Sequence, residues 1–159
     1  MALLFMAWGP LCLLAAFVFA RAMRREKLHA AMLSALGIAP GQGLDHSENG
    51  TGIALDPKAK ILALLGRGGY QVYAYDKIRE WASNEERASG VVGAGLIGAV
   101  GAAGNNIRAA REAEANTGLF VTVKDLDNPQ WRVAMKDRTM RARWMELLQQ
   151  EINERQSAI

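Results

Sequence analysis

The chain has 159 residues, with 19 Lys and Arg against 16 Asp and Glu, two His and one Cys. This length accommodates one modest domain and a short additional segment, but not two full domains. One Cys excludes an internal disulfide and a Cys-rich zinc module, and so few His leave too few ligands for a His-based metal centre or a Cys/His dyad. We therefore expect no catalytic residues, no metal and no cofactor.

The first 20 residues, MALLFMAWGPLCLLAAFVFA, contain no charged side chain. As a helix rising about 1.5 Å per residue, they would span the roughly 30 Å hydrocarbon core of a bilayer. A cleaved signal sequence would have a basic segment before the apolar run and an A-x-A-like site after it, and the sequence has neither. The segment therefore predicts an uncleaved transmembrane helix, with a cleaved signal sequence and a buried core helix as the alternatives.

A basic flank follows the apolar segment. Arg21, Arg24, Arg25 and Lys27 stand against Glu26 alone, and the rest of the chain has 15 basic and 15 acidic residues. Because a one-sided basic flank is normally retained in the cytoplasm, residues 1–27 predict a single-pass anchor of the inner (plasma) membrane, with the N-terminus outside and the domain cytoplasmic. The neutral remainder offers no basic face to follow a phosphate backbone, so we expect membrane lipid and no nucleic acid as a partner.

Residues 28–51 are predicted to be a helical extension followed by a linker. Helix formers dominate residues 28–36, and Gly37 with Pro40 forms a stop, so the anchor helix is expected to continue to this point. Residues 41–52, GQGLDHSENGTG, contain Leu44 as their only large apolar side chain. This stretch has little to bury, which predicts a linker.

The domain is predicted to occupy residues 52–156 and to begin with strands. Residues 52–56 and 61–65 predict a hairpin, and the segment from Gly66 to Gly69 predicts a turn, because it is too short for a phosphate-binding loop. Further strands are predicted over 70–75, near 76–81, over 119–123 and over 131–135, with a turn at 125–129.

A final amphipathic helix is expected after Asp137, whose carboxylate can cap its first turn. Apolar residues follow at helical spacing and predict a face that packs on the sheet; they are Met140, Trp144, Leu147, Leu148 and Ile152. The fold class is therefore α+β, with a transmembrane helix, an antiparallel sheet or barrel and a closing helix. The tyrosines and tryptophans of the strands and of this helix are expected to be packing residues.

The order of these elements resembles the pleckstrin-homology (PH) superfold, as in bacterial PH-like domains of unknown function that often follow a membrane segment. The passages that carry the resemblance are GIALDPKAKILAL, YAYDKIREW and TVKDLDNPQWRVAM, with Trp144 where PH domains place an aromatic residue in the closing helix. The resemblance implies a binding platform and no catalysis. The first hairpin has only Lys58 and Lys60, beside Asp56, where phosphoinositide-binding PH domains carry a dense basic cluster.

A glycine-rich insertion, SGVVGAGLIGAVGAAG, interrupts the strand pattern at residues 89–104. Gly90, Gly93, Gly98 and Gly101 are candidates for close helix packing, against the anchor or against another copy of the chain. A mobile insertion and a membrane-inserted segment are the alternatives, and a helix of this length would rise only about 24 Å, which is short for a bilayer. Residues 105–115 predict a short solvated helix.

The remaining candidate residues are few. Lys58 and Lys60, with Arg138, Arg141 and Arg143 in the last helix, are candidates for contact with anionic lipid or with an acidic partner. The carboxylates that could serve an enzyme are Asp76, Glu80, Asp125 and Asp127, and no motif places two of them together.

The leading functional hypothesis is a single-pass, membrane-anchored cytoplasmic module, from a bacterium or its mobile elements, that binds a protein partner or assembles with itself. The alternatives are a peripheral domain that senses anionic lipid and, more weakly, an enzyme acting on a membrane-bound substrate.

Overall fold

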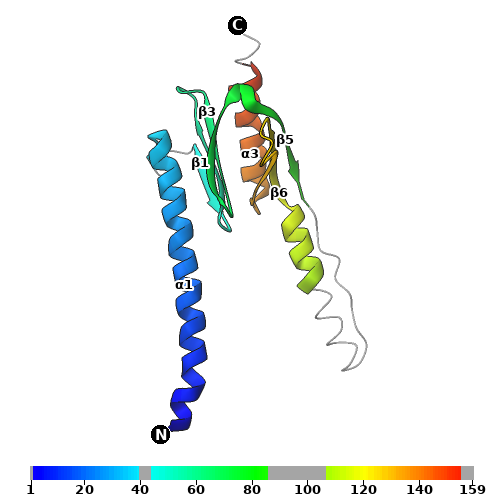
Figure 1. The fold of residues 1–159 in the computed structure, drawn as a ribbon. Coiled ribbons are helices and arrows are strands. Elements are labelled where there is room, and N and C mark those ends of the chain that lie inside the picture. Colours follow the sequence, from blue (N-terminus) through cyan, green and yellow to red (C-terminus); the bar gives the residue numbers. More distant parts are fainter. Residues whose placement is uncertain (1, 40–43, 86–106, 155–159) are drawn as a thin grey trace, which may run out of the picture.

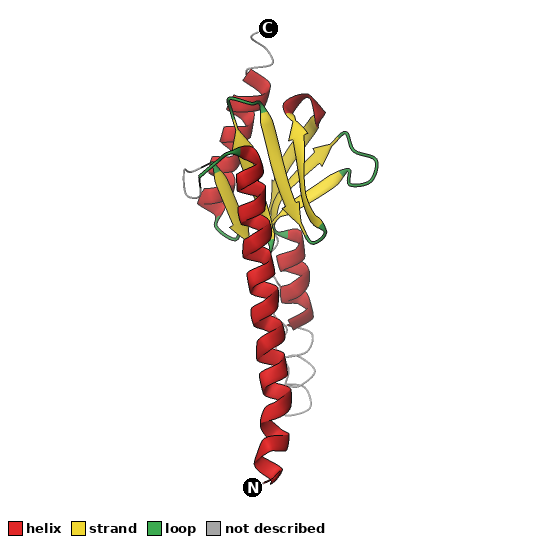
Figure 2. Cartoon of the chain, turned by 60° about the vertical axis from the view of Figure 1, so that its left-hand side comes forward, coloured by secondary structure: helices red, strands yellow, loops and turns green. Residues whose placement is uncertain are grey.

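The computed structural model describes residues 2–39, 44–85 and 107–154, with the side chains of the first helix described from Cys12 onwards. One long helix, α1 (Ala2–Leu36), precedes a domain of antiparallel strands and helices, so the α+β class is confirmed. Figure 2 shows α1 running along the domain and extending well beyond it. Within the described residues, no helix combines the length and the apolar character that crossing a membrane requires.

The predicted stop ends α1. Gly37 adopts a φ of 68°, its N–H donates to Ser34 O at 3.1 Å, and the N–H of Ile38 donates to Leu33 O at 3.1 Å. This pair of bonds is a Schellman motif, which satisfies the last carbonyls of the helix and favours glycine at the left-handed position. The helix therefore continues from the apolar segment through the basic flank to Leu36 without a break, as the sequence predicts.

The first sheet contains four strands in the order β1-β2-β3-β4. They are β1 (Asp45–Glu48), β2 (Thr51–Asp56), β3 (Ile61–Gly66) and β4 (Gly69–Ala74). The predicted hairpin over 52–65 is confirmed, with Ile53 paired to Leu64 and Leu55 to Leu62. The prediction of a linker over 41–52 is wrong for residues 45–52, because residues 45–48 form β1, 49–50 form a two-residue turn and 51–52 begin β2.

The second sheet contains three strands in the order β5-β6-β7. A single 3-10 turn, η1 (Tyr75–Lys77), leads into β5 (Ile78–Asn84), which pairs with β6 (Gly118–Val123). The predicted last hairpin is confirmed, because β6 pairs in turn with β7 (Gln130–Val133). The sequence predicts an antiparallel sheet or barrel. In the described residues the strands form two separate sheets, and no closed barrel is seen.

A helix packs on the sheets, as predicted. It consists of α3 (Arg138–Leu148), continued by the π-helical segment η2 (Gln149–Glu154). The predicted cap is confirmed, since Asp137 Oδ1 accepts a hydrogen bond from the N–H of Thr139 at 2.9 Å. Trp144, Leu148 and Ile152 are buried, which confirms the predicted apolar face.

Strands β2 and β3 are buried on both faces. Ile53, Leu55, Leu62 and Leu64 join the core shared with the second sheet and α3. The alternate residues of the same two strands, with Leu65 at the end of β3, face α1 and pack against Met32, Leu33 and Leu36. Figure 1 shows this layering, with α1 on one side of the first sheet and α3 on the other. Burial on both faces explains the continuous apolar runs in these strands.

A short helical segment, residues 107–116, precedes β6. It projects from the same end of the domain as the N-terminal half of α1 (Figures 1 and 2), and it confirms the short helix predicted over 105–115. The glycines proposed for helix packing, Gly90, Gly93, Gly98 and Gly101, lie with the whole insertion 89–104 outside the described residues.

Candidate binding cleft between α1 and the sheet turns

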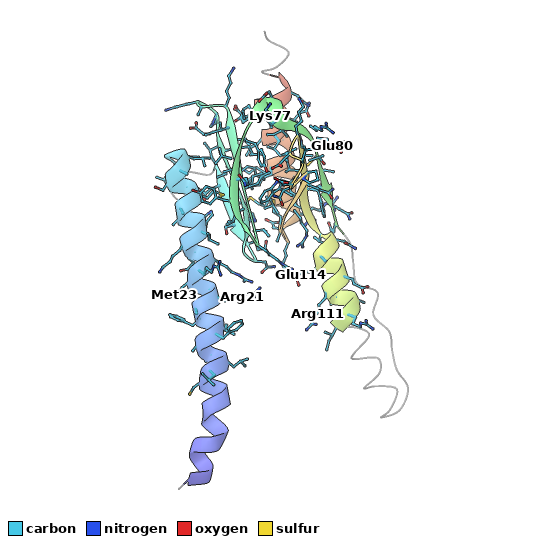
Figure 3. All side chains as sticks on the ribbon, viewed as in Figure 1. Arg21, Met23, Lys77, Glu80, Arg111 and Glu114 are labelled. Carbon is cyan, nitrogen blue, oxygen red and sulfur yellow. The ribbon has the colours of Figure 1, made fainter. Side chains whose placement is uncertain are left out.

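Three arginines of the basic flank lie on the face of α1 that turns toward the domain. Arg21, Arg24, Arg25 and Leu28 follow one another at positions i, i+3, i+4 and i+7, which places them on one side of a helix. The same side continues one turn later to the buried Met32. Figure 3 shows Arg21 on the side of α1 that faces the domain and Met23 on the opposite side.

Two hairpin turns of the first sheet face these arginines. Asn49 and Gly50, between β1 and β2, have φ values of 53° and 75°. Positive φ at both central residues is the requirement of a type I′ turn, for which Asn-Gly is the preferred pair. A Cβ atom at Gly50 would lie 2.8 Å from Arg25 Nε, so the absence of a side chain at Gly50 leaves room for this guanidinium.

The second turn connects β3 to β4 and contains Arg67. Gly66 pairs with Gly69, so Arg67 and Gly68 form the two-residue connection. A Cβ atom at Gly66 would lie 3.0 Å from the ring of Trp131, and this close approach keeps the base of the turn against the second sheet. Arg67 is thereby held at the end of the sheet that faces Arg21 and Arg24.

Helix and turns together enclose a cleft of about 470 Å³. We call it the arginine cleft; its lining residues are Phe17, Ala20, Arg21, Arg24, Arg25 and Leu28 from α1, and Asn49, Gly50, Gly66 and Arg67 from the turns. None of these lining residues is acidic. Among the described residues, no carboxylate pairs with any of the four guanidinium groups and no acceptor bonds to them. The cleft is therefore a site of uncompensated positive charge, suited to an anion.

Lys58 and Lys60 lie elsewhere. They are exposed in the turn between β2 and β3, at the opposite end of β2 from Gly50. At about 3.3 Å per residue, the length of β2 separates the two turns by about 20 Å. These lysines and the arginine cleft therefore belong to opposite ends of the domain.

The three arginines predicted for contact in the last helix do not form one surface. Arg138 and Arg143 are exposed, whereas Arg141 is 3% exposed. Arg141 Nη1 donates to Met135 O at 2.6 Å and to Lys136 O at 3.0 Å, and Nη2 pairs with Glu85 Oε2 at 2.7 Å. Its guanidinium binds the chain itself and is not available to a partner. The burial of this side chain results from the packing of α3 on the sheets, which the charge pattern of α3 does not indicate.

Among the described residues, no hydrogen bond joins the carboxylate groups of any two of the four candidates. Asp76 pairs with Lys77 at 3.5 Å, and Glu80 accepts a hydrogen bond from Thr122 at 3.4 Å. Figure 3 places Lys77 and Glu80 at the end of the domain away from the N-terminal half of α1. No group of three or more His, Cys, Asp or Glu side chains in the described part of the chain could hold a metal ion.

Asp125 serves the contact between the two sheets. Its Oδ2 accepts a hydrogen bond from the Tyr73 hydroxyl at 2.7 Å, and its Oδ1 accepts one from the N–H of Asp127 at 2.9 Å. Trp131 Nε1 donates to the Tyr73 oxygen at 3.1 Å. The hydrogen bond from Tyr73 lowers the pKa of Asp125, while burial raises the pKa of Tyr73 to about 12, with the bond to Asp125 adding to the effect.

The residues of the cleft that sequence reasoning missed are Asn49, Gly50 and Arg67. Asn-Gly between residues of strand character is a strong local signal of a hairpin, and it would have identified the turn between β1 and β2. No local signal joins Arg67 to the flank, because they are more than 40 residues apart in the sequence and meet only when α1 docks on the first sheet.

Comparison with known protein families identifies the domain. The family described as a domain of unknown function, DUF4755, matches residues 44–155. No curated protein and no solved structure matches the chain significantly. The matched range begins just before β1 and ends just after η2, so it contains both sheets and α3 and leaves α1 outside. Since the match covers most of the chain, the protein belongs to the DUF4755 family.

Proposed function

We propose that this protein is a membrane-anchored, non-catalytic binding module, in which α1 holds the DUF4755 domain at the cytoplasmic surface of a bacterial plasma membrane. The observation that carries the proposal is the bare apolar surface of α1 beyond the domain. Leu13, Leu14, Phe17, Val18 and Phe19 are each between 59% and 74% exposed. They lie on more than one side of the helix, and an apolar surface all round a helix needs a membrane or a partner to cover it.

Charge and continuity support the same arrangement. The uncharged first 20 residues are followed directly by the basic flank, whose retention in the cytoplasm orients the N-terminus outward. Because α1 is continuous to Leu36, and Leu33 and Leu36 pack on the first sheet, the helix would hold the domain in a defined orientation to the membrane. A flexible tether would leave the orientation free.

The type of domain supports binding as its activity. The PH resemblance implies antiparallel strand pairs closed by one C-terminal helix, which agrees with the two antiparallel sheets and α3, and we propose a PH-like fold on this basis. Folds of this kind serve as platforms whose loops and edges contact partners. The side chains of Asp76, Glu80 and Asp125 bond to Lys77, Thr122 and Tyr73 and not to one another, so they do not form the carboxylate pair that acid–base catalysis commonly uses. The partner class that we propose is a protein, including a second copy of this chain.

The anchor can be tested by extraction of membranes with alkaline carbonate, which releases peripheral proteins and leaves spanning ones behind. We expect the full chain to remain in the membrane pellet. The double variant Leu13→Asp with Leu14→Asp should be released, since each carboxylate costs about 2.5–3.5 kcal/mol at the centre of a spanning helix. Val72→Asp, at a valine that is also exposed but lies on β4, is the matched control and should stay in the pellet.

Release of the unmodified chain by carbonate would refute the anchor. The topology is tested separately by protease treatment of inverted and right-side-out vesicles. The domain should be digested only in the inverted vesicles, and the opposite pattern would show that it lies outside the cytoplasm.

A further inference from the structure

We infer that the arginine cleft binds the phosphate of an anionic phospholipid from the membrane that holds α1. This inference rests on the proposed function and deepens it, because it names a ligand for the point where the anchor meets the domain. The site is composite, with three guanidinium groups from α1 and one from the turn between β3 and β4.

The positions of the charges point to a ligand. Retention of the flank in the cytoplasm requires only basic residues near the end of the apolar segment, on any side of the helix. In this chain Arg21, Arg24 and Arg25 line the cleft on the docking side of α1, whereas Lys27 does not line it. A helix face that turns toward its own domain is normally apolar or paired with opposite charge. Here the three arginines are exposed and no described carboxylate pairs with them, so an external anion is the natural complement.

The chemistry of the groups specifies a phosphate. A guanidinium presents its N–H donors in a planar fork that matches two phosphate oxygens, and several arginines around one space favour a phosphate over a single carboxylate. The Asn49 amide lines the same space, although its Nδ2 already donates to Glu114 Oε1 at 2.8 Å. Glu114 does not line the cleft itself.

The apolar part of the lining favours a lipid over a free phosphate. Phe17 and Ala20 border the cleft, and they belong to the last turn of the uncharged segment, where the proposed anchor would leave the hydrocarbon. A lipid could place its phosphate among the arginines and its glycerol and first acyl carbons against Phe17. Free phosphate would leave that apolar border without a function.

Arg67 is the residue to substitute in the test, because it belongs to the domain and is not part of the flank that orients the anchor. We would incubate the full chain, in a neutral detergent, with equal amounts of phosphatidylglycerol and phosphatidylcholine, and measure by native mass spectrometry how many molecules retain each lipid. We expect an excess of phosphatidylglycerol. Arg67→Gln should lower the ratio about fivefold, the effect of removing one cation near an anionic headgroup.

Lys58→Gln is the matched control, since it removes the same charge from an exposed turn at the other end of β2. It should leave the lipid ratio unchanged. Addition of millimolar inorganic phosphate should also leave the ratio unchanged. Arg67→Gln should remain in the membrane pellet after carbonate extraction, so loss of lipid selectivity and loss of the anchor are separate results.

Three results would overturn the inference. Equal retention of the two lipids would show that the cleft does not select a negative headgroup. An unchanged ratio in Arg67→Gln would show that the flank alone attracts the lipid, without a composite site. Displacement of phosphatidylglycerol by inorganic phosphate would show that the site takes a free anion.

Discussion

Replacement of Arg141 by methionine tests whether this arginine is part of the framework of the domain, as its geometry indicates, or a surface residue, as the charge pattern of α3 suggested. Its guanidinium donates to two backbone carbonyls, Met135 O and Lys136 O, and pairs with Glu85. The two carbonyls belong to the segment between β7 and α3, so Arg141 fixes the position of the helix on the sheets.

The expected loss of stability follows from these contacts. A hydrogen bond from a charged donor contributes about 1.5–3 kcal/mol, and the carbonyls of Met135 and Lys136 would lose two of them. The ion pair adds little, because the Glu85 side chain is 38% exposed and water can replace its partner. Removal of a buried charge also recovers part of its desolvation cost, and methionine retains the apolar volume. We therefore expect a net loss of about 3 kcal/mol.

The measurement is urea unfolding of the full chain in neutral detergent, followed by circular dichroism. With a slope of about 1.5 kcal/mol per molar, the midpoint for Arg141→Met should fall by about 2 M. Arg138→Met and Arg143→Met are the controls, because both arginines are exposed on the same helix, and each should change stability by no more than about 0.5 kcal/mol. If Arg141→Met unfolds at the same urea concentration as these controls, the structural role assigned to Arg141 is refuted.

Three further changes probe the turns, the contact between the sheets and the docking of α1. Gly50→Ala should cost at least about 1 kcal/mol in urea unfolding, because it forces a side chain into a left-handed position and against Arg25, whereas Gly68→Ala, with open space around it, should be nearly neutral. The hydrogen bond from Tyr73 lowers the pKa of Asp125, so the stability that the Asp125 carboxylate contributes should be lost as the pH falls through the acidic range. Burial raises the pKa of Tyr73 to about 12, so the stability that the neutral Tyr73 hydroxyl contributes should be lost as the pH rises from about 10 toward 12. Tyr73→Phe should reduce both losses in thermal unfolding across pH, and a profile identical to that of the unmodified chain would contradict the assignment. Leu33→Ala should weaken the packing of α1 on the first sheet by about 2–5 kcal/mol, and trypsin should then cleave the basic flank faster. An unchanged cleavage rate would show that Leu33 does not hold α1 on the sheet.

The proposed lipid site bears on how firmly α1 holds the domain. A lipid bound between Arg67 and the flank would add a second attachment between the anchor and the domain, beside the apolar contact of Leu33 and Leu36 with the first sheet. Both attachments use the side of α1 that faces the domain. The edge strand β4 and the turn at Lys58 and Lys60 would then remain accessible to a protein partner.

Local chemistry along the sequence determined most of the secondary structure. Gly37 ends α1 because a glycine accepts the left-handed conformation, and Asp137 begins α3 because its carboxylate accepts from the helix N-terminus. The hairpins of β2 with β3 and of β6 with β7 follow from apolar runs separated by turn residues. The sequence did not predict β1 because its residues, Asp45 to Glu48, are polar and show no strand pattern of buried side chains. Backbone pairing with β2 holds this strand in place.

Only the tertiary structure decided which charges act together. Arg138, Arg141 and Arg143 are neighbours in sequence, yet the fold buries Arg141 and leaves the other two in water. Arg67 lies far along the chain from Arg25, yet docking of α1 brings both to one cleft. The physical reason is that helix and strand formation depends on nearby residues, whereas the environment of a charge depends on every element that packs around it. The sequence alone therefore indicated a basic flank, and the packing of α1 on the first sheet places part of that flank in one cleft with Arg67.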